Sequence, residues 1–160
     1  MAVIVEDGTI VENANSYVDV TFVDTYATAF GYDTWAGTTE EKEAAVLKSA
    51  IYVDSKNYVG GIVSGVQEMS WPRTGAIVNG FLIDTDMIPT KIKNAQAEAA
   101  IRALSCDLSP DLARGGMVKR KKVDVLETEY MDGATVGTTY QVIDQILKPY
   151  LQNSNILELA

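Results

Sequence analysis

The sequence contains no histidine and only one cysteine, Cys106. Histidine is the commonest general base near neutral pH and the commonest metal ligand in proteins. A single cysteine excludes an intramolecular disulfide and a thiolate zinc cluster, and it suits a reducing cytoplasm. We therefore expect a protein that is not an enzyme and that holds no metal or cofactor.

The sequence also lacks a long apolar run and a basic N-terminus. No run approaches the ~20 residues that cross a bilayer. The first cation is Lys42, so we expect no secretory signal peptide and no membrane contact. Cations are scarce throughout, and the formal net charge is −9. Such a charge argues against a general nucleic-acid binder, although a local basic patch remains compatible with it.

What the sequence does contain is typical of a globular protein. Its 160 residues are 47% hydrophobic and 22% charged, which suits one domain with a real core. Apolar spacing predicts four helices, over residues 21–30, 40–56, 89–107 and 141–151. Thr21, Pro89 and either Thr138 or Thr139 are expected helix starts, and Gly31 is an expected stop. Thr38 and Glu41 have the spacing of a capping box.

The expected fold is mainly α, a small bundle of about four helices with an extended β-hairpin arm and short N-terminal strands. We predict one domain over residues 1–160. Its parts are N-terminal strands over 1–18, with a hairpin turn at Asp7-Gly8, a helical core over 19–108 and an extended arm over 115–135. A C-terminal helix over 139–151 and a tail over 152–160 complete it. The tail carries Ile156, Leu157 and Leu159, which we expect to dock on the chain's own core or on a neighbour.

The second predicted helix has a broad apolar face. Ala44, Leu47, Ile51 and Tyr58 mark one stripe, and the stripe is widened by Val46, Ala50 and Val53. Asp54 lies beside this stripe, where exposure at the rim is the favoured interpretation and a buried, paired carboxylate is the alternative.

The most unusual local pattern is a run of four consecutive cations, Lys119, Arg120, Lys121 and Lys122, in this acidic chain. Valines and a leucine bracket the run, which indicates an extended, ordered element. Alternation puts Lys119, Lys121 and Val123 on one face and Val118, Arg120 and Lys122 on the other. Because neither face is apolar, the run suits an arm or an edge, and a solvated hairpin is an equal alternative.

The stretch after Gly60-Gly61 is predicted to be loop for about thirty residues. At its centre lies Trp71-Pro72-Arg73, which we interpret as a structural motif. Trp71 is expected to fill the helical core, with base stacking as the alternative. Arg73 is expected to stack on an aromatic ring or to pair with a carboxylate. Asp84 and Asp86 lack the rest of a calcium-loop pattern, so we interpret them as surface turn acids.

Several short motifs occur in a characteristic order along nearly the whole chain, from about residue 10 to 151. They are Asn13-Ala14-Asn15-Ser16-Tyr17-Val18, Trp35, Glu41-Lys42-Glu43-Ala44-Ala45, Trp71-Pro72-Arg73, Ile88-Pro89, Asp111-Leu112, Gly116-Met117-Val118-Lys119, Glu127-Thr128-Glu129-Tyr130 and Lys148-Pro149-Tyr150-Leu151. In this order they resemble the head–tail adaptor proteins of tailed bacteriophages, also called head-completion or connector proteins. Members of that group are often labelled DnaT-like single-stranded-DNA-binding proteins.

The resemblance implies a structural virion protein, made in the host cytoplasm and located in the neck between capsid and tail. Such subunits form a ring, typically dodecameric, below the portal, and the ring extends the DNA channel. The implied partners are the portal protein, neck or tail-completion proteins, other copies of the chain and the packaged DNA. Lys119, Arg120, Lys121 and Lys122 would then contact the portal or the DNA. The alternative function is a single-stranded-DNA-binding accessory protein of replication.

Overall fold

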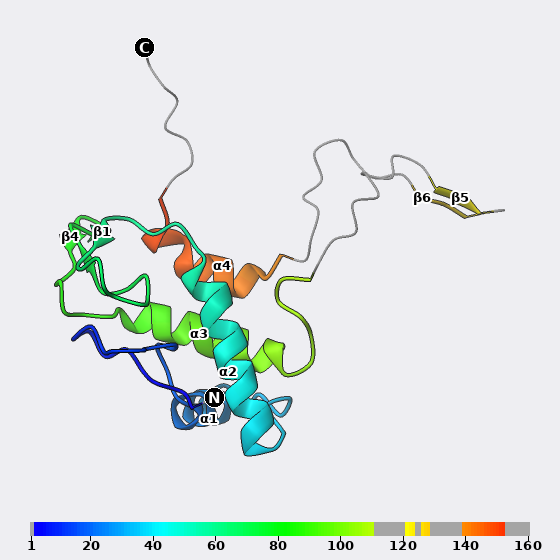
Figure 1. Cartoon of the computed structure of the whole chain (residues 1–160). Helices are drawn as coiled ribbons and strands as arrows, with labels where there is room; N and C mark the ends of the chain where they lie inside the picture. The colour runs from blue at the N-terminus through cyan, green and yellow to red at the C-terminus, as the bar shows by residue number, and fades with distance from the viewer. Residues whose placement is uncertain (1, 111–120, 124–125, 129–138, 153–160) are drawn as a thin grey trace, which may run out of the picture. The chain divides into compact units, whose positions relative to one another are not determined.

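The computed structural model describes residues 2–110, 121–123, 126–128 and 139–152. The chain divides into two compact units, one of residues 1–108 with 140–160 and one of residues 109–139. In the described residues, the first unit holds four α-helices: α1 (Val20–Phe30), α2 (Thr39–Asp54), α3 (Thr90–Ala103) and α4 (Gln141–Leu147) (Figure 1). The prediction of a mainly α fold with about four helices is confirmed.

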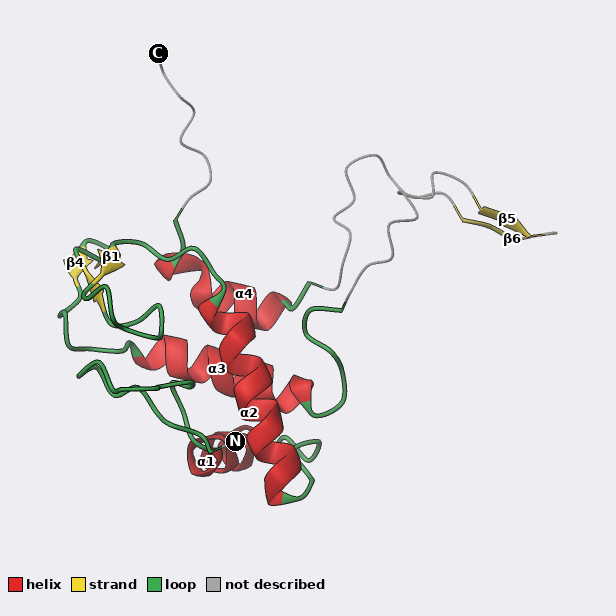
Figure 2. Cartoon of the chain, viewed as in Figure 1, coloured by secondary structure: helices red, strands yellow, loops and turns green. Residues whose placement is uncertain are grey.

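The described strands are short and pair locally. They are β1 (Gly61–Ile62), β2 (Arg73–Thr74), β3 (Ile77–Val78), β4 (Phe81–Leu82), β5 (Lys121–Val123) and β6 (Leu126–Thr128) (Figure 2). Each pairs antiparallel with its sequence neighbour, as β1–β2, β3–β4 and β5–β6. No helix in the described ranges is long and apolar enough to cross a membrane.

Helix α3 is the centre of the helical unit, and α1, α2 and α4 all pack against it. Five alanines of α3 are buried, namely Ala95, Ala97, Ala99, Ala100 and Ala103. Small side chains let neighbouring helices approach closely, so a short alanine-rich helix can be covered on several sides.

Local chemistry sets the helix starts, with some corrections to the predicted residues. Asp19 caps α1 in place of Thr21, and its carboxylate accepts from the Phe22 amide at 2.7 Å. Gly31 ends α1 as predicted, with a φ of 71° that a residue without Cβ adopts freely. The capping box of Thr38 and Glu41 is confirmed at the start of α2.

The predicted apolar face of α2 was wrong in part. Ala44 is exposed, and Ile51 is 74% exposed. The buried face is made by Val46, Ala50 and Val53, together with Ala45 and Ser49. The sequence offers two overlapping apolar stripes, and the position of α3 selects one of them.

The later helices are shorter than predicted. Helix α3 ends at Ala103 rather than Asp107, and Pro89 is its N-cap rather than its first residue. Helix α4 ends at Leu147 and continues as a 3₁₀ turn over Lys148–Tyr150, because Pro149 cannot donate a backbone hydrogen bond. Tyr140 is the N-cap of α4 without a side-chain hydrogen bond, so Thr139 does not cap it, and Thr138 lies outside the described residues.

The predicted N-terminal hairpin was also wrong. Val5 instead forms a parallel bridge with Ser16, and the loop between them is closed by the buried carboxylate of Glu6. Glu6 accepts from the backbone amides of Gly8, Ile10 and Val11 at 2.9, 3.0 and 2.9 Å. Gly8 has a φ of 114°, and a Cβ there would lie 1.9 Å from a carbonyl oxygen of the loop before α3. The Asp7-Gly8 turn therefore belongs to an irregular loop closed by a side chain.

Two hairpins interrupt the segment predicted to be loop. In the β3–β4 hairpin, Ile77 lies opposite Leu82 and Val78 lies opposite Phe81. Asn79 and Gly80 connect the strands with φ values of 51° and 85°. Asn-Gly between apolar residues is a strong signal for such a two-residue turn, and the sequence analysis missed it.

Candidate functional site

Trp71-Pro72-Arg73 lies inside the helical unit. Trp71 and Pro72 are fully buried, and the indole packs edge-on against Tyr58 and Tyr150, with ring centroids 5.7 and 6.1 Å apart. The prediction that Trp71 fills the core is confirmed. A fully buried indole presents no face on which a nucleic-acid base could stack.

Arg73 does not stack on an aromatic ring or pair with a carboxylate, so that prediction was wrong. Its Nε donates to the carbonyl of Val59 at 2.7 Å, and its Nη1 donates to Ser70 at 3.0 Å. Its Nη2 donates to the carbonyls of Tyr58 and Gly60 at 3.2 and 2.7 Å. The planar guanidinium thus ties together two chain segments whose carbonyls converge on it.

Asp54 is half-buried and paired, so the favoured interpretation of an exposed rim carboxylate was wrong. It accepts from the hydroxyl of Tyr17 and, at 2.7 Å, from the amide of Ser70. The Tyr17 hydroxyl in turn accepts from the Trp71 amide at 3.1 Å. Burial, together with the nearby Asp54 charge, raises the pKa of Tyr17 well above its usual value, so the phenol stays protonated as a donor.

The same network reaches helix α3 through Gln96, which is fully buried. Its Oε1 accepts from the Tyr17 amide at 2.8 Å, and its Nε2 donates to the Ser16 hydroxyl at 2.7 Å. The Ser16-Tyr17 pair and Trp71 therefore meet in one closed network. These hydrogen bonds give a structural role to two of the sequence motifs, Asn13-Ala14-Asn15-Ser16-Tyr17-Val18 and Trp71-Pro72-Arg73.

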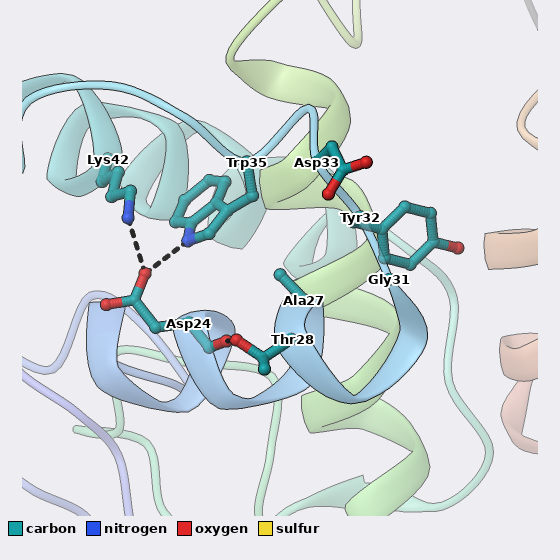
Figure 3. Close-up of a pocket in the computed structure, with 8 residues that line it drawn as sticks. All are labelled: Asp24, Ala27, Thr28, Gly31, Tyr32, Asp33, Trp35 and Lys42. Carbon is teal, nitrogen blue, oxygen red and sulfur yellow. Dashed lines mark hydrogen bonds and ion pairs between the residues drawn. The ribbon is translucent and has the colours of Figure 1, made fainter.

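A surface pocket of about 420 Å³ lies between α1, its following loop and α2 (Figure 3). Asp24 accepts from the indole of Trp35 at 2.6 Å and from the ammonium of Lys42 at 2.7 Å. The hydrogen bond from Lys42 is the main cause that holds the pKa of Asp24 below its usual value. The sequence analysis missed this cluster. Because its charges satisfy one another, we assign the cluster a structural role.

A second cluster missed by the sequence analysis surrounds Glu98. This side chain is 2% exposed, and its Oε1 accepts from the hydroxyls of Tyr26 and Tyr32 at 2.9 and 2.8 Å. Arg102, one turn along α3, pairs with its other oxygen. A glutamate in an alanine-rich helix, followed by arginine at i+4, was the available signal.

The acidic turn between β4 and α3 shows no metal-binding geometry. Asp84 and Asp86 are both exposed. Within the described ranges, no group of three or more metal-ligating acidic or cysteine side chains comes together.

The β5–β6 hairpin includes part of the predicted cationic arm. Its register places Lys121 opposite Thr128, Lys122 opposite Glu127 and Val123 opposite Leu126. An extended, paired conformation is therefore confirmed for these residues. Lys119 and Arg120 lie outside the described residues, as do Ile156, Leu157 and Leu159 of the tail.

Exposed apolar side chains gather in one segment of the helical unit, which we call the hairpin lobe (residues 60–87). Ten large apolar side chains are exposed in the described residues, and seven of them belong to the hairpin lobe. These seven are Ile62, Val63, Val66, Ile77, Phe81, Leu82 and Met87. Exposed apolar surface on this scale is typical of sites where a protein binds a partner.

A family model described as "Putative DnaT-like ssDNA binding protein" matches residues 1–159. The chain belongs to this family. The match to the DnaT-like family spans both compact units, so it includes the hydrogen-bond network of Tyr17, Trp71 and Gln96, the hairpin lobe and the β5–β6 hairpin. No curated protein and no solved structure matches the chain.

Proposed function

We propose that this DnaT-like family member is a structural, non-enzymatic subunit of a phage particle. In this role it forms a ring below the portal, connects the capsid to the neck or tail and extends the DNA channel. The observation that carries the proposal is that the two compact units differ in their polar groups. The polar clusters of the helical unit are structural, while the cations of Lys119–Lys122 belong to the separate unit that holds the β5–β6 hairpin.

The charge of the chain supports this function. A net charge of −9 suits a channel wall along which DNA slides without sticking. Ring closure repeats any local patch in every subunit, so a few lysines per chain become a charged collar. The cations of the arm then meet portal carboxylates or the DNA backbone. The tail, with Ile156, Leu157 and Leu159, supplies a second docking segment toward the portal or an adjacent subunit.

Single-stranded-DNA binding is the second candidate, and the family's description favours it more directly than it favours the adaptor. A binder of this kind needs aromatic platforms beside a basic groove. The two tryptophans do not provide them, since Trp35 is 6% exposed and Trp71 is fully buried. A DNA-binding role would therefore not use indole stacking, and its phosphate contacts would come from the cationic arm.

The first test is cryo-electron microscopy of the neck in intact particles of the parent phage. The adaptor function predicts a ring of this chain under the portal. Absence of the chain from the particle would contradict the adaptor function and favour single-stranded-DNA binding.

A variant separates the two candidates in solution and in particles. Neutralising Lys119, Arg120, Lys121 and Lys122 together to glutamine should sharply weaken neck assembly at physiological salt if the arm docks by charge. Unchanged assembly in that variant would contradict docking through these cations. Binding of a fluorescent oligodeoxythymidine with a steep salt dependence, lost in the same variant, would support the DNA-binding candidate.

A further inference from the structure

The hairpin lobe presents apolar side chains that nothing in the described residues covers. In the β3–β4 hairpin, Ile77 and Leu82 are cross-strand neighbours, and they are 61% and 68% exposed. Phe81 and Val66 are 76% and 81% exposed. Leaving this much apolar surface in water is unfavourable, so it indicates a partner surface.

The charges of the hairpin lobe indicate what kind of partner fits. Glu68, Asp84 and Asp86 are exposed acids of the lobe. Arg73 is the only cation between Lys56 and Lys91, and its guanidinium is taken up by four backbone carbonyls. The lobe is therefore both apolar and acidic. Its complement is a segment that is both apolar and basic.

The chain itself contains such a segment in its other compact unit. Strand β5 is Lys121-Lys122-Val123, and it pairs with β6, which begins at Leu126. In the described hairpin, the cations Lys121 and Lys122 lie opposite Thr128 and the acid Glu127, and Val123 and Leu126 form an apolar pair. The cationic strand β5 and the acidic hairpin lobe thus give each copy two segments of opposite charge, each with apolar residues.

We propose that the hairpin lobe of one copy receives the β5–β6 hairpin of a second copy. The inference rests on the proposed ring and names the contact that builds it. A contact between two different surfaces of identical chains is heterologous, and repeated contacts of this kind close into rings when the rotation permits. Apolar contact with Ile77 and Leu82 supplies the association energy, and the charges of Glu68 and Asp84 select the partner and its orientation.

Charge-swap variants of the full chain test the proposal by sedimentation velocity over a concentration series. The lobe variant is E68K/D84K, the hairpin variant is K121E/K122E, and the control is D33K/E40K, which reverses two exposed acids outside the lobe. In the part of the chain that the structure describes, the exposed side chains of Glu68 and Asp84 make no hydrogen bond or ion pair, so the lobe variant should fold normally. Thermal unfolding of each variant checks this.

We expect the lobe and hairpin variants each to raise the dissociation constant for self-association by at least about tenfold. Combining the two variants should recover most of the lost affinity, because the swapped charges again attract each other. The control should change the constant by less than about twofold. Raising the salt concentration should weaken the wild-type contact.

Three results would overturn the proposal. One is a wild-type chain that stays monomeric at every concentration, and another is a lobe variant that associates as the wild type does. The third is protection of the hairpin lobe from hydrogen exchange that is independent of concentration, because it would place the partner within the same chain. If intact particles nevertheless hold a ring of the chain, the proposed function survives and only this contact is rejected.

Discussion

At the scale of single residues, buried polar groups hold the helical unit together by reaching carbonyls, amides and hydroxyls. Arg73 donates to four backbone carbonyls, and the buried side chains of Glu6 and Gln96 bind backbone or hydroxyl partners. In the described residues, the only buried side-chain polar atom without a partner is Nε1 of Trp71. Burial of that indole is thus stabilised by packing against aromatic rings and not by a hydrogen bond.

Because Arg73 donates to several carbonyls at once, we predict that another cationic side chain cannot replace it. Arg73→Lys keeps the charge but loses the planar fork, and carbonyls that converge on one point are left without donors. We expect a loss of about 1.5–3 kcal/mol in the free energy of unfolding, measured by urea denaturation. Lys48→Arg at an exposed position of α2 is the control and should change stability by less than about 0.5 kcal/mol. Equal stability of Arg73→Lys and wild type would show that the carbonyl contacts add little.

Asp24 predicts a pH dependence of stability whose sign follows from its lowered pKa. Hydrogen bonds from Lys42 and Trp35 favour its ionised form in the folded chain. The stabilisation is therefore complete above the unfolded-state pKa of about 4, and it is lost as the pH falls through the lower folded-state value. We expect the melting temperature of Asp24→Asn to lie below that of the wild type at neutral pH and to approach it under acid conditions. A constant difference between the two across this pH range would contradict the prediction.

At the scale of elements, short-range chemistry decides where helices begin and end. The capping box at α2 and Gly31 after α1 were predicted from residue type and spacing, because each acts on backbone groups within four residues. The two-residue turn at Asn79-Gly80 also depends on local residue type, although the sequence analysis missed it. The starts of α1 and α4 were mispredicted where several hydrogen-bonding residues lay close together.

Two neighbouring threonines at the start of α2 allow a controlled test of the capping box. Thr38 accepts from the Glu41 amide at 3.3 Å, whereas Thr39 is the first residue of α2 and is exposed. We expect Thr38→Ala to lower the free energy of unfolding by about 0.5–2 kcal/mol. Thr39→Ala should leave it within about 0.5 kcal/mol, as measured by urea denaturation of both variants. If the two variants lose the same amount, the cap is not the source of the effect.

At the scale of the whole molecule, the unit of residues 109–139 is inserted between two parts of the helical unit. The points where the helical unit is interrupted lie close together, since the Tyr140 hydroxyl donates to the Asp107 carbonyl at 3.1 Å. Insertions with neighbouring ends can be exchanged for a short connection at small entropic cost. The helical unit should therefore fold without the inserted unit.

Replacing residues 110–138 with a short glycine–serine linker tests this independence. We expect cooperative unfolding to persist, with a melting temperature within about 5 °C of the wild type by circular dichroism. The same variant should lose self-association, because it lacks the β5–β6 hairpin. Loss of cooperative unfolding would instead mean that the inserted unit is part of the helical unit's core.

The sequence by itself determined the fold class, the order of the helices, the α2 capping box and the burial of Trp71. These follow from hydrophobic periodicity and from contacts within a few residues, which a linear sequence records directly. It also indicated an extended conformation for the cationic run, and the β5–β6 hairpin confirms this for the described part of that run.

Only the tertiary structure decided which stripe of α2 is buried, which groups Arg73 and Asp54 bind, and where apolar residues stay exposed. Gln96 meets Ser16 and Tyr17 across about eighty residues of sequence, and the carbonyls around Arg73 converge only after the chain has turned back on itself. Such partners are chosen by packing between distant segments, so no local pattern specifies them. The exposed apolar side chains of the hairpin lobe were likewise identified only from the structure, because exposure is a property of the folded surface and not of residue type.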